Sequence, residues 1–565
     1  MTTLSPLSFF VACSPSLLPS SSKKPSNAPN RYRRNVSCNA SNPQEQQPPQ
    51  NRRDVLVGLG GLGAANAAAI FSYNPFASAE PVAPDVKGCN KPDLPAGAKP
   101  IVCCPPNLEK KDPIDYDIPK WETLRIRKPA HDYDDLENYK KAVSMMKSLP
   151  DDHPHSWTQQ SRVHCAYCDD SYNLYGQTHT KLQVHFSWTF LPFHRWYLYF
   201  YERILGKLIG VPNFAIPFWN WDAPQGMEIP SIFTDKSSPL YNSLRNPNHQ
   251  PPTLLDLNWN GPGDVDTSGD EKTNLITMYR QVYEAKRPLS FYGSPFNADT
   301  PGKETSGTLE LVPHNTIHNW TGDITQPNLE DMGAFYSAAR DPIFYGHHAN
   351  VDRMWAIWKS FKRNDISNPD YQNSSYVFYD ENENLVRVKN SDAFDTKKLG
   401  YVYRELDLPW LNAKPTPRRT KAQRKGMTVK KMDLPFTLKE KIVSTVVKRP
   451  KINRSRAEKD EKEETLVFSL QLDRTKNLKF DVLIDEEEDY KWANPKYREF
   501  AGSFVNVSST LNRASTVTFS IDITDVLDQL DADDEDSIVV TLVPQYGNEV
   551  LIKDINISFL SLQEI

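Results

Sequence analysis

One stretch of the chain, DPIFYGHHANVDRMWAIWKSF at 341–361, repeats its apolar residues at helical spacing. The intervals of four, three, four and three connect Phe344, His348, Val351, Trp355 and Trp358. This stripe predicts a helix with one buried face, and Pro342 suits the start of that helix. His348 belongs to the stripe, whereas His347 points about 100° away, toward its flank. We therefore expect His348 to face the core.

Two other stretches predict helices with histidines in their first turns. In QVHFSWTFLPFHRWYLYFYERIL (183–205), Pro192 suits the first helical position and His194 follows it. His185 lies nine residues earlier, about 180° around a continuous helix, so it belongs to a preceding turn or a separate segment. In LELVPHNTIHNW (309–320), His314 and His318 stand at i and i+4 and share one helix face.

The last hundred residues follow a different period. TLVFSLQL, STVTFSIDIT and SIVVTLVP are rich in β-branched residues and alternate in polarity, which predicts short strands of a small β-sandwich (464–565). Before them, 413–463 is polar and basic, as in NAKPTPRRTKAQRKGMTVKKM, and we expect an exposed, cleavable linker there. The C-terminal unit has no histidine and no cysteine.

Composition confines the chemistry to one region of the chain. The 565 residues carry a net charge of −5, so neither nucleic acid nor an anionic membrane surface is indicated as a partner. All 12 histidines fall between His131 and His348. If imidazole groups carry out the chemistry, the site lies in the domain formed by 80–412, which precedes the basic stretch and the sandwich.

The N-terminus has the composition of a targeting segment. Residues 1–44 contain no Asp or Glu and many Ser, which is typical of an organellar transit peptide. Arg52 and Arg53 then precede a Gly- and Ala-rich apolar run of about 17 residues, and Ala77-Ser78-Ala79 supplies small residues for cleavage. A membrane span is the alternative, but the run is barely long enough. Paired arginines there indicate an export signal, so 1–79 predicts delivery through the chloroplast to the thylakoid lumen and removal before Glu80. We expect no membrane span in the mature chain.

The sequence VHCAYC at 163–168 places a histidine beside two cysteines. This spacing fits zinc, thiol redox chemistry or a structural disulfide equally well. Beyond the targeting segment the chain has five cysteines: Cys89, Cys103, Cys104, Cys165 and Cys168. Two disulfides use four of them. The neighbours Cys103 and Cys104 need different partners, which uses Cys89 and Cys165 and leaves Cys168 unpaired.

Six histidines divide into two sets of three: His164, His185 and His194, then His314, His318 and His348. Nitrogen-rich sets without a carboxylate at matching spacing suit zinc, copper or iron. Two such sets in one domain do not fit structural zinc, which prefers closed four-ligand sites with thiolates.

These motifs resemble those of plant polyphenol oxidases, a family of type-3 copper proteins. VHCAYC with QVHFSWTFLPFHRWYLYFYE is similar to the family's first copper motif, and PHNTIHNW with DPIFYGHHANVDRMW to its second. The resemblance reaches KFDV at Lys479–Val482 and covers nearly the whole chain. It implies a mainly α domain, with a four-helix bundle around two copper ions and long loops, which a C-terminal β-sandwich covers and keeps latent.

The resemblance also implies roles for particular residues. The two histidine sets are the copper ligands, and Cys168 forms a thioether with the His185 ring. Cys165 forms a disulfide to the N-terminal loop, and Cys89, Cys103 and Cys104 complete the two disulfides. Glu310 orients a water and accepts a phenolic proton, Asn315 tunes substrate deprotonation, and Phe335 is an aromatic gate above the second copper.

The implied activity is oxidation of o-diphenols to o-quinones, with O2 as co-substrate and small phenols as substrates. Hydroxylation of monophenols is left open. Reversible oxygen carriage at the same kind of site is the alternative, against which the targeting signals argue. A zinc hydrolase is the weaker alternative, because no general base accompanies a typical open-site motif. The chain departs from the family at Asp370-Tyr371-Gln372, where DWL is usual, so the packing there needs another explanation.

Overall fold

The structure is a computed structural model that describes residues 81–106, 112–177, 179–263, 269–296, 305–425, 432–509, 515–547 and 549–562. All of these residues belong to one compact unit. The expected targeting segment, 1–79, lies outside them. Within these ranges, no helix combines the length and apolar character needed to cross a bilayer.

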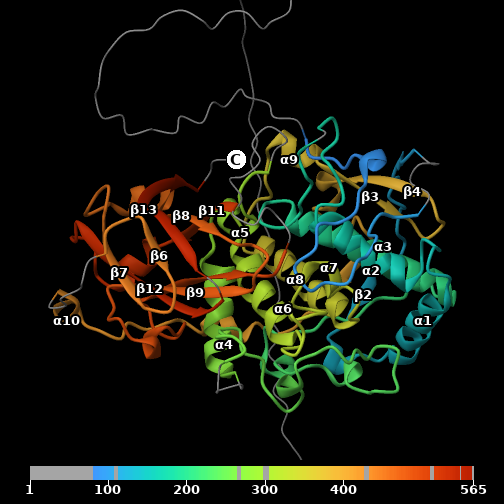
Figure 1. Ribbon diagram of the computed structural model, residues 1–565, viewed down its shortest axis with the longest axis horizontal. Helices are drawn as coiled ribbons and strands as arrows, with labels where there is room; N and C mark the ends of the chain where they lie inside the picture. The colour runs from blue at the N-terminus through green and yellow to red at the C-terminus, as the bar shows by residue number, and fades with distance from the viewer. Residues whose placement is uncertain are drawn as a thin grey trace, which may run out of the picture. The chain divides into compact units, whose positions relative to one another are not determined.

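The region before the β-sandwich is mainly helical, as predicted. Four helices carry the histidine motifs: α2 (Trp157–Cys168), α3 (Phe190–Ile209), α6 (Asn315–Thr321) and α8 (Ile343–Ser360) (Figure 1). The other helices of this region are α1 (Leu136–Ser148), α4 (Glu271–Met278), α5 (Pro288–Tyr292), α7 (Phe335–Ala338) and α9 (Pro369–Asn373). Helix α3 packs on α1 and α8, and α2 packs on α7. Long loops join these helices.

Local sequence signals set the helix ends. Ser156 caps α2, since its hydroxyl accepts a hydrogen bond from the amide of Gln159 at 3.1 Å. Gly210 ends α3 with φ of 72°, a left-handed conformation that favours glycine. The prolines lie near the helix starts, with shifts of a residue or two from the prediction. Pro342 immediately precedes α8, whereas Pro192 is the third residue of α3.

A buried ion-pair network holds α8 in place. Asp352, one turn after His348, pairs with Arg195 of α3 and with Arg127 at 3.3 Å. The hydroxyls of Tyr401 and Tyr403 also donate to Asp352, the first at 2.6 Å. These arginines and tyrosines come from α3 and from a small parallel sheet of β2 (Arg125–Arg127) and β5 (Tyr401–Tyr403). The GYVY sequence at 400–403 therefore closes the domain against α8.

A second small sheet covers another side of this region. It consists of β1 (Ile114–Asp115), β4 (Leu385–Lys389) and β3 (Ser375–Tyr379), in that order. Just before β3 lies Tyr371, at the position where the sequence departs from the family. Its ring is buried, 5.1 Å from Trp188 and stacked on Phe394 at 5.9 Å. The tyrosine thus fills this site with aromatic packing.

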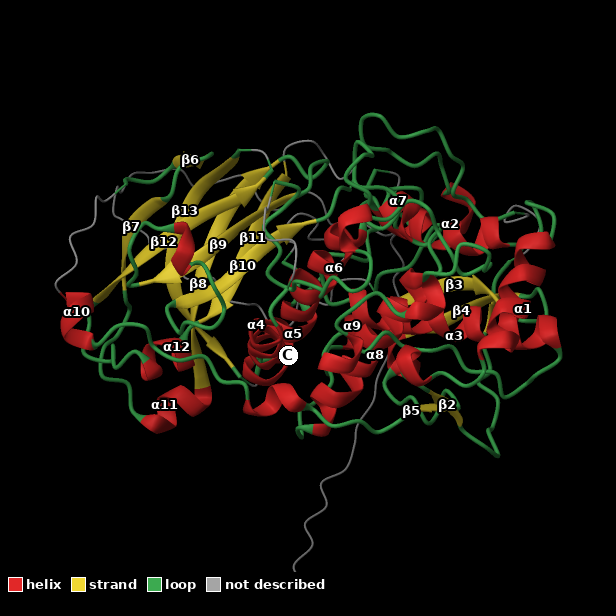
Figure 2. Ribbon diagram, turned by 90° about the horizontal axis from the view of Figure 1, so that it is seen from below, coloured by secondary structure: helices red, strands yellow, loops and turns green. Residues whose placement is uncertain are grey.

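The C-terminal third is the predicted β-sandwich (Figure 2, strands in yellow). One antiparallel sheet has the order β10-β9-β12-β7 and the other β11-β8-β13-β6. The strands are β6 (Phe436–Leu438), β7 (Val443–Lys448), β8 (Lys462–Leu472), β9 (Leu478–Ile484), β10 (Phe500–Asn506), β11 (Ser515–Asp522), β12 (Ser537–Tyr546) and β13 (Val550–Ser561). Alternating side chains of both sheets, such as Leu466, Phe468 and Leu470, form their common core.

The range 413–463, expected to be an exposed linker, differs from that expectation. It contains strands β6 and β7, which pair with β13 and β12, and the short helices α10 (Lys421–Lys425) and α11 (Arg456–Glu461). The start of the range also lies on the sandwich, because the Arg418 guanidinium pairs with Glu486. Charged residues mask these short edge strands in the sequence. Residues 426–431 of this range lie outside the described residues.

Candidate metal centre

The first histidine set converges from two helices and the segment between them. His164 lies in α2, His194 in the first turns of α3, and His185 in the bend just before α3. Their ring centroids lie 5.1 to 5.5 Å apart. His185 therefore occupies a separate segment, as the helical phase predicts.

The second set comes from α6 and α8. The His314 and His318 ring centroids are 4.5 Å apart, and the His348 ring lies 4.9 Å from that of His314. The Nε2 atoms of His318 and His348 face each other at 3.3 Å. Helix α6 begins only at Asn315, and the chain enters it after a kink at Val312, where the backbone is extended. Pro313 thus lies before the helix, and the two histidines still share one face.

Hydrogen bonds to Nδ1 orient four of the rings. The Nδ1 atoms of His164, His194 and His318 lie 2.7, 2.8 and 2.6 Å from the backbone carbonyls of Phe335, Phe190 and Met332. The Nδ1 of His314 lies 2.9 Å from the Oδ1 of Asn315. Because a carbonyl oxygen only accepts, each of these Nδ1 atoms carries the proton. The Nε2 lone pairs are then left to point into the centre, as metal ligands require.

The environment keeps these imidazoles neutral. All six are buried, and burial lowers the pKa of His164 to about 3 and that of His318 to about 4. Burial, with repulsion between neighbouring rings, holds the pKa of the other four well below the usual histidine range. A neutral imidazole is the form that binds a metal.

The nitrogen positions fit two neighbouring metal ions. Donor atoms of His164, Cys168 and His185 lie within 4.8 Å of one another, and so do those of His164, His194 and His348. The Nε2 atoms of His164, His185, His194 and His314 have no hydrogen-bond partner among the described residues, which is costly for buried polar atoms. Six buried imidazoles in two facing sets, with one thiol beside the first set, suit copper.

His347, which was expected to face the flank of the apolar stripe, lies beside the second histidine set. It is fully buried, and its donor atoms lie within 4.8 Å of those of His314, His318 and His348. Its ring centroid is 5.1 Å from that of His318 and 5.9 Å from that of Trp221. Because α6 covers the flank of α8, two residues 100° apart on α8 both reach the cluster.

Cysteines tie the first set to the N-terminal segment. Disulfides join Cys89 to Cys104 and Cys103 to Cys165, the same four residues that the resemblance pairs. Cys165 directly follows His164 in α2. Cys168 is buried and unbridged, and its sulfur lies close to the nitrogens of His185. Burial and nearby carboxylates raise the pKa of the Cys168 thiol well above its usual range.

The three predicted non-ligand residues surround the cluster. The Phe335 ring stacks on that of His185 at 3.9 Å and lies 5.7 Å from that of His164, so it lies over the first set, whereas a gate above the second copper was expected. Glu310 accepts a hydrogen bond from the amide of Phe186 at 2.6 Å and is fully buried. The side chain of Asn315 orients His314, as described above.

The β-sandwich covers the centre directly. The backbone carbonyl of Val505 accepts from the Asn315 amide at 2.9 Å, and that of Asn506 accepts from Asn319 at 3.2 Å. The Val507 side chain is fully buried within the core of the helical domain. The guanidinium of Arg474 lies over the Phe186 ring at 3.8 Å. Nothing in the local sequence of these residues marks them as neighbours of the metal centre.

Comparison with known proteins agrees with this site. Residues 154–360 match the common central domain of tyrosinase, 365–416 the polyphenol oxidase middle domain, and 434–559 the chloroplastic polyphenol oxidase C-terminal domain. The chain is thus a tyrosinase-type protein with a dinuclear copper site.

Two proteins of similar sequence define the family more closely. A chloroplastic polyphenol oxidase from Malus domestica is 48% identical over 561 residues, covering 94% of this chain and 93% of that protein. Aureusidin synthase from Antirrhinum majus is 47% identical over 512 residues, covering 87% and 91%. The chain belongs to the plant polyphenol oxidases, copper-dependent enzymes that oxidise phenols.

Two solved structures resemble the fold. Latent apple tyrosinase superposes with a TM-score of 0.74 at 48% identity, covering 80% of this chain and all of that one. A latent aurone synthase superposes with a TM-score of 0.80 at 38% identity, covering 86% and all of that chain. Both structures were solved in the latent form.

Proposed function

We propose that this chain oxidises o-diphenols to o-quinones, and that its C-terminal β-sandwich keeps it latent until the sandwich is displaced or cleaved. The observation that carries the proposal is the pair of facing histidine sets, which the sandwich covers. In these sets the Nε2 atoms of His164, His185, His194 and His314 have no hydrogen-bond partner among the described residues. In the balanced reaction, two catechols and one O2 give two quinones and two waters. Copper, when bound, supplies the electron exchange between the diphenol and O2.

The ligands in this proposal are the six histidines of the two sets. His164, His185 and His194 hold one copper, and His314, His318 and His348 hold the other. Backbone carbonyls that fix the Nδ1 protons support this assignment, because they preorganise the rings before a metal binds. Cys168 forms a thioether with His185. This link restrains a ring for which the described residues offer no hydrogen-bond partner.

Residues around the ligands handle the phenol. Glu310 orients a water and accepts a phenolic proton, which its burial beside the cluster supports. Asn315 holds His314 and adjusts how easily the substrate is deprotonated. Phe335 stacks on His185 and so narrows the approach to the ligands. The substrate is a small mono- or diphenol. The proposal includes some monophenol hydroxylation, because two relatives are named larreatricin hydroxylase and aureusidin synthase.

Latency follows from what the sandwich occupies. The backbone carbonyls of Val505 and Asn506 accept hydrogen bonds from the side-chain amides of the two asparagines that follow His314 and His318. Val507 packs into the helical core beside them. A phenol reaches the centre only after these groups leave. The relatives' chloroplastic names and the N-terminal signals support delivery of this chain to the chloroplast and onward to the thylakoid lumen.

The test compares full-length protein with protein nicked by trypsin between Arg418 and Lys431. Metal analysis of the intact chain should find two copper ions per chain. Nicking should raise oxidation of 4-methylcatechol several-fold without changing the copper content, because the cut frees the sandwich. Equal activity before and after nicking, with the fragments separated by gel filtration, would rule out the covering role. Oxygen binding without catechol turnover would favour a carrier.

A further inference from the structure

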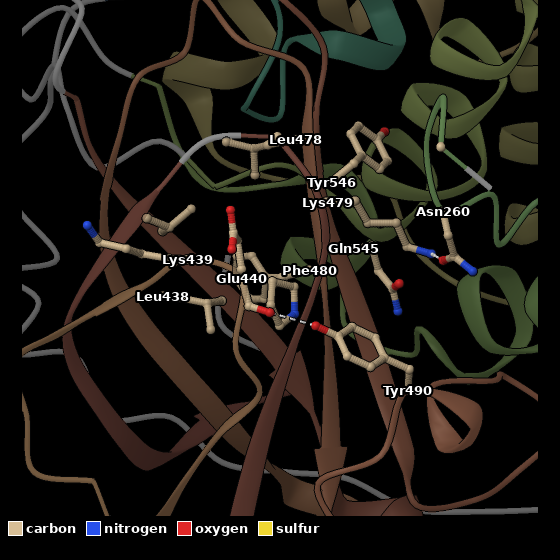
Figure 3. A pocket seen from close by; sticks show the side chains of 14 residues that line it. Asn260, Leu438, Lys439, Glu440, Leu478, Lys479, Phe480, Tyr490, Gln545 and Tyr546 are labelled. Carbon is tan, nitrogen blue, oxygen red and sulfur yellow. Dashed lines mark hydrogen bonds between the residues drawn. The ribbon is translucent and has the colours of Figure 1, made fainter.

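A cavity of about 560 Å³ opens along the seam between the two domains, away from the metal centre (Figure 3). The sandwich supplies most of its wall through β9, β12 and the segments around Glu440 and Tyr490. The helical domain supplies Asn260 and Gly263. This volume is typical of small-molecule sites, and the cavity plays no part in the proposed oxidation. We define it as the seam cavity.

The seam cavity combines apolar side chains with hydrogen-bonding groups. Leu438, Leu478 and Phe480 supply apolar surface and are themselves nearly fully buried. Tyr490 is 49% exposed, so its ring has accessible surface for stacking against another ring. An occupant therefore needs an apolar face as well as polar groups.

The polar groups accept more hydrogen bonds than they donate. Gln545 uses its Nε2 on Asp481 at 2.7 Å, which leaves its Oε1 as an acceptor. The Tyr490 hydroxyl donates to the Glu440 carbonyl at 2.7 Å, which leaves its oxygen as an acceptor. The Glu440 carboxylate has no partner among the described residues and adds two acceptor oxygens. Among the described lining residues, Asn260 offers its Nδ2 as a donor, because its Oδ1 already accepts from Lys479, and the Tyr546 hydroxyl offers its hydrogen.

Charge excludes an anion as the occupant. Lys479 is buried and lies 3.4 Å from Asp481, and Lys439 pairs with Glu549. Both lysines are therefore neutralised, and Glu440 leaves one unpaired negative charge at the rim. A neutral ligand with several hydroxyl donors and a ring fits these groups. We propose that the seam cavity binds a neutral polyhydroxylated ring compound, of the class of aryl glycosides.

Occupancy should hold the sandwich in place. The cavity wall comes from both domains, so a ligand there contacts both and binds only the docked state. Its wall also contains two of the residues that join the domains. The Lys479 ammonium donates to Asn258 and Asn260 of the helical domain, and the Tyr546 hydroxyl accepts from Asn319 at 2.9 Å. Asn319 follows His318, so the seam cavity adjoins the contacts that cover the metal centre. This regulatory effect, unlike the binding itself, rests on the proposed function.

The experiment measures binding of phenyl β-D-glucopyranoside to the full-length, copper-loaded protein by isothermal titration and saturation-transfer NMR. Its phenolic oxygen is glycosylated, so it is neither oxidised nor able to bind copper as a phenolate. We expect saturable binding that Glu440→Ala and Tyr490→Ala each weaken by about tenfold or more. Glu488→Ala is the matched control, because Glu488 is exposed on the same domain and does not line the cavity.

Two results would overturn the site: no saturable binding, or binding that both cavity variants retain. Thermal unfolding of each variant keeps the result interpretable, since a loss of binding counts only when the sandwich remains folded. A second arm measures the rate of trypsin activation with and without the glycoside, which should slow it. An unchanged rate despite binding would refute the holding effect and leave catechol oxidation, measured separately on nicked protein, unaffected.

Discussion

Asp522 offers a direct way to loosen the sandwich without cutting the chain. Its carboxylate lies on the sandwich and pairs with Arg287 of the helical domain at 2.7 Å, and Ser290 also donates to it. Within the sandwich it accepts from Thr465 at 2.8 Å. We predict that Asp522→Asn raises the activity of the intact, uncleaved enzyme, because the change removes the charge that holds Arg287.

The size of the effect follows from burial. Removing one partner of a buried ion pair costs about 3–5 kcal/mol, because the other charge stays buried and unpaired. The Arg287 and Asp522 side chains are only 5% and 14% exposed, so the lower end applies. About 3 kcal/mol corresponds to an increase of roughly 100-fold in the undocked fraction. Intact Asp522→Asn protein should therefore approach the activity of nicked wild type.

The assay is oxygen uptake with 4-methylcatechol before and after trypsin treatment, reported as the ratio of the two rates. Wild type should show a ratio well above one, and Asp522→Asn a ratio near one. Asp528→Asn is the control, because Asp528 pairs with Lys459 inside the sandwich. Arg287→Gln removes the other partner of the same ion pair, on the helical domain, and should also lower the ratio. An unchanged ratio in both Asp522→Asn and Arg287→Gln would refute the reasoning.

The same carboxylate predicts a pH dependence of latency. Arg287 holds the pKa of Asp522 below its usual 3.8, so the pair favours docking above that pH and is lost as the pH falls through the lowered pKa. Latency should therefore hold at neutral pH and weaken in acid, as the pH falls through the lowered pKa of Asp522.

The remaining predictions concern the metal centre. Cys168→Ser should preserve the fold and both disulfides but loosen His185, and peptide mass analysis of the parent should find the two residues crosslinked. A Cys168 thiol that alkylates in the native copper-loaded protein would contradict this. His348→Ala should lower the copper content from two ions to one, whereas His347→Ala should retain both, since three other nitrogens still serve each copper. Loss of a copper ion from His347→Ala by metal analysis would make that residue a ligand.

Sequence patterns predicted the parts of this protein that depend on local spacing. The i and i+4 relation placed His314 and His318 on one helix face, and the apolar stripe placed His348 in the core. The nine-residue offset excluded His185 from the helix of His194. Alternation predicted β8, β11 and β12 within a few residues. Each of these signals acts over one element.

Features that depend on a distant partner could not be predicted in this way. His347 reaches the cluster because α6 covers its flank, and a helical phase contains no information about that neighbour. Val507 fills a core more than a hundred residues away in sequence, with only ordinary strand residues around it. The edge strands β6 and β7 lie in a basic stretch, where charged residues interrupt the short apolar alternation that would otherwise predict strands.

The two disulfides have a topological consequence for proteolysis. Because Cys104 bonds back to Cys89 and Cys103 bonds forward to Cys165, the two covalent loops overlap. Any single backbone cut between Cys89 and Cys165 leaves the pieces joined by at least one sulfur bridge. The chain has no cysteine after Cys168, so a single cut in the stretch before β6 leaves the sandwich attached by non-covalent contacts alone. The same protease thus leaves the cut N-terminal segment covalently joined to the enzyme, whereas the cut C-terminal sandwich is able to dissociate.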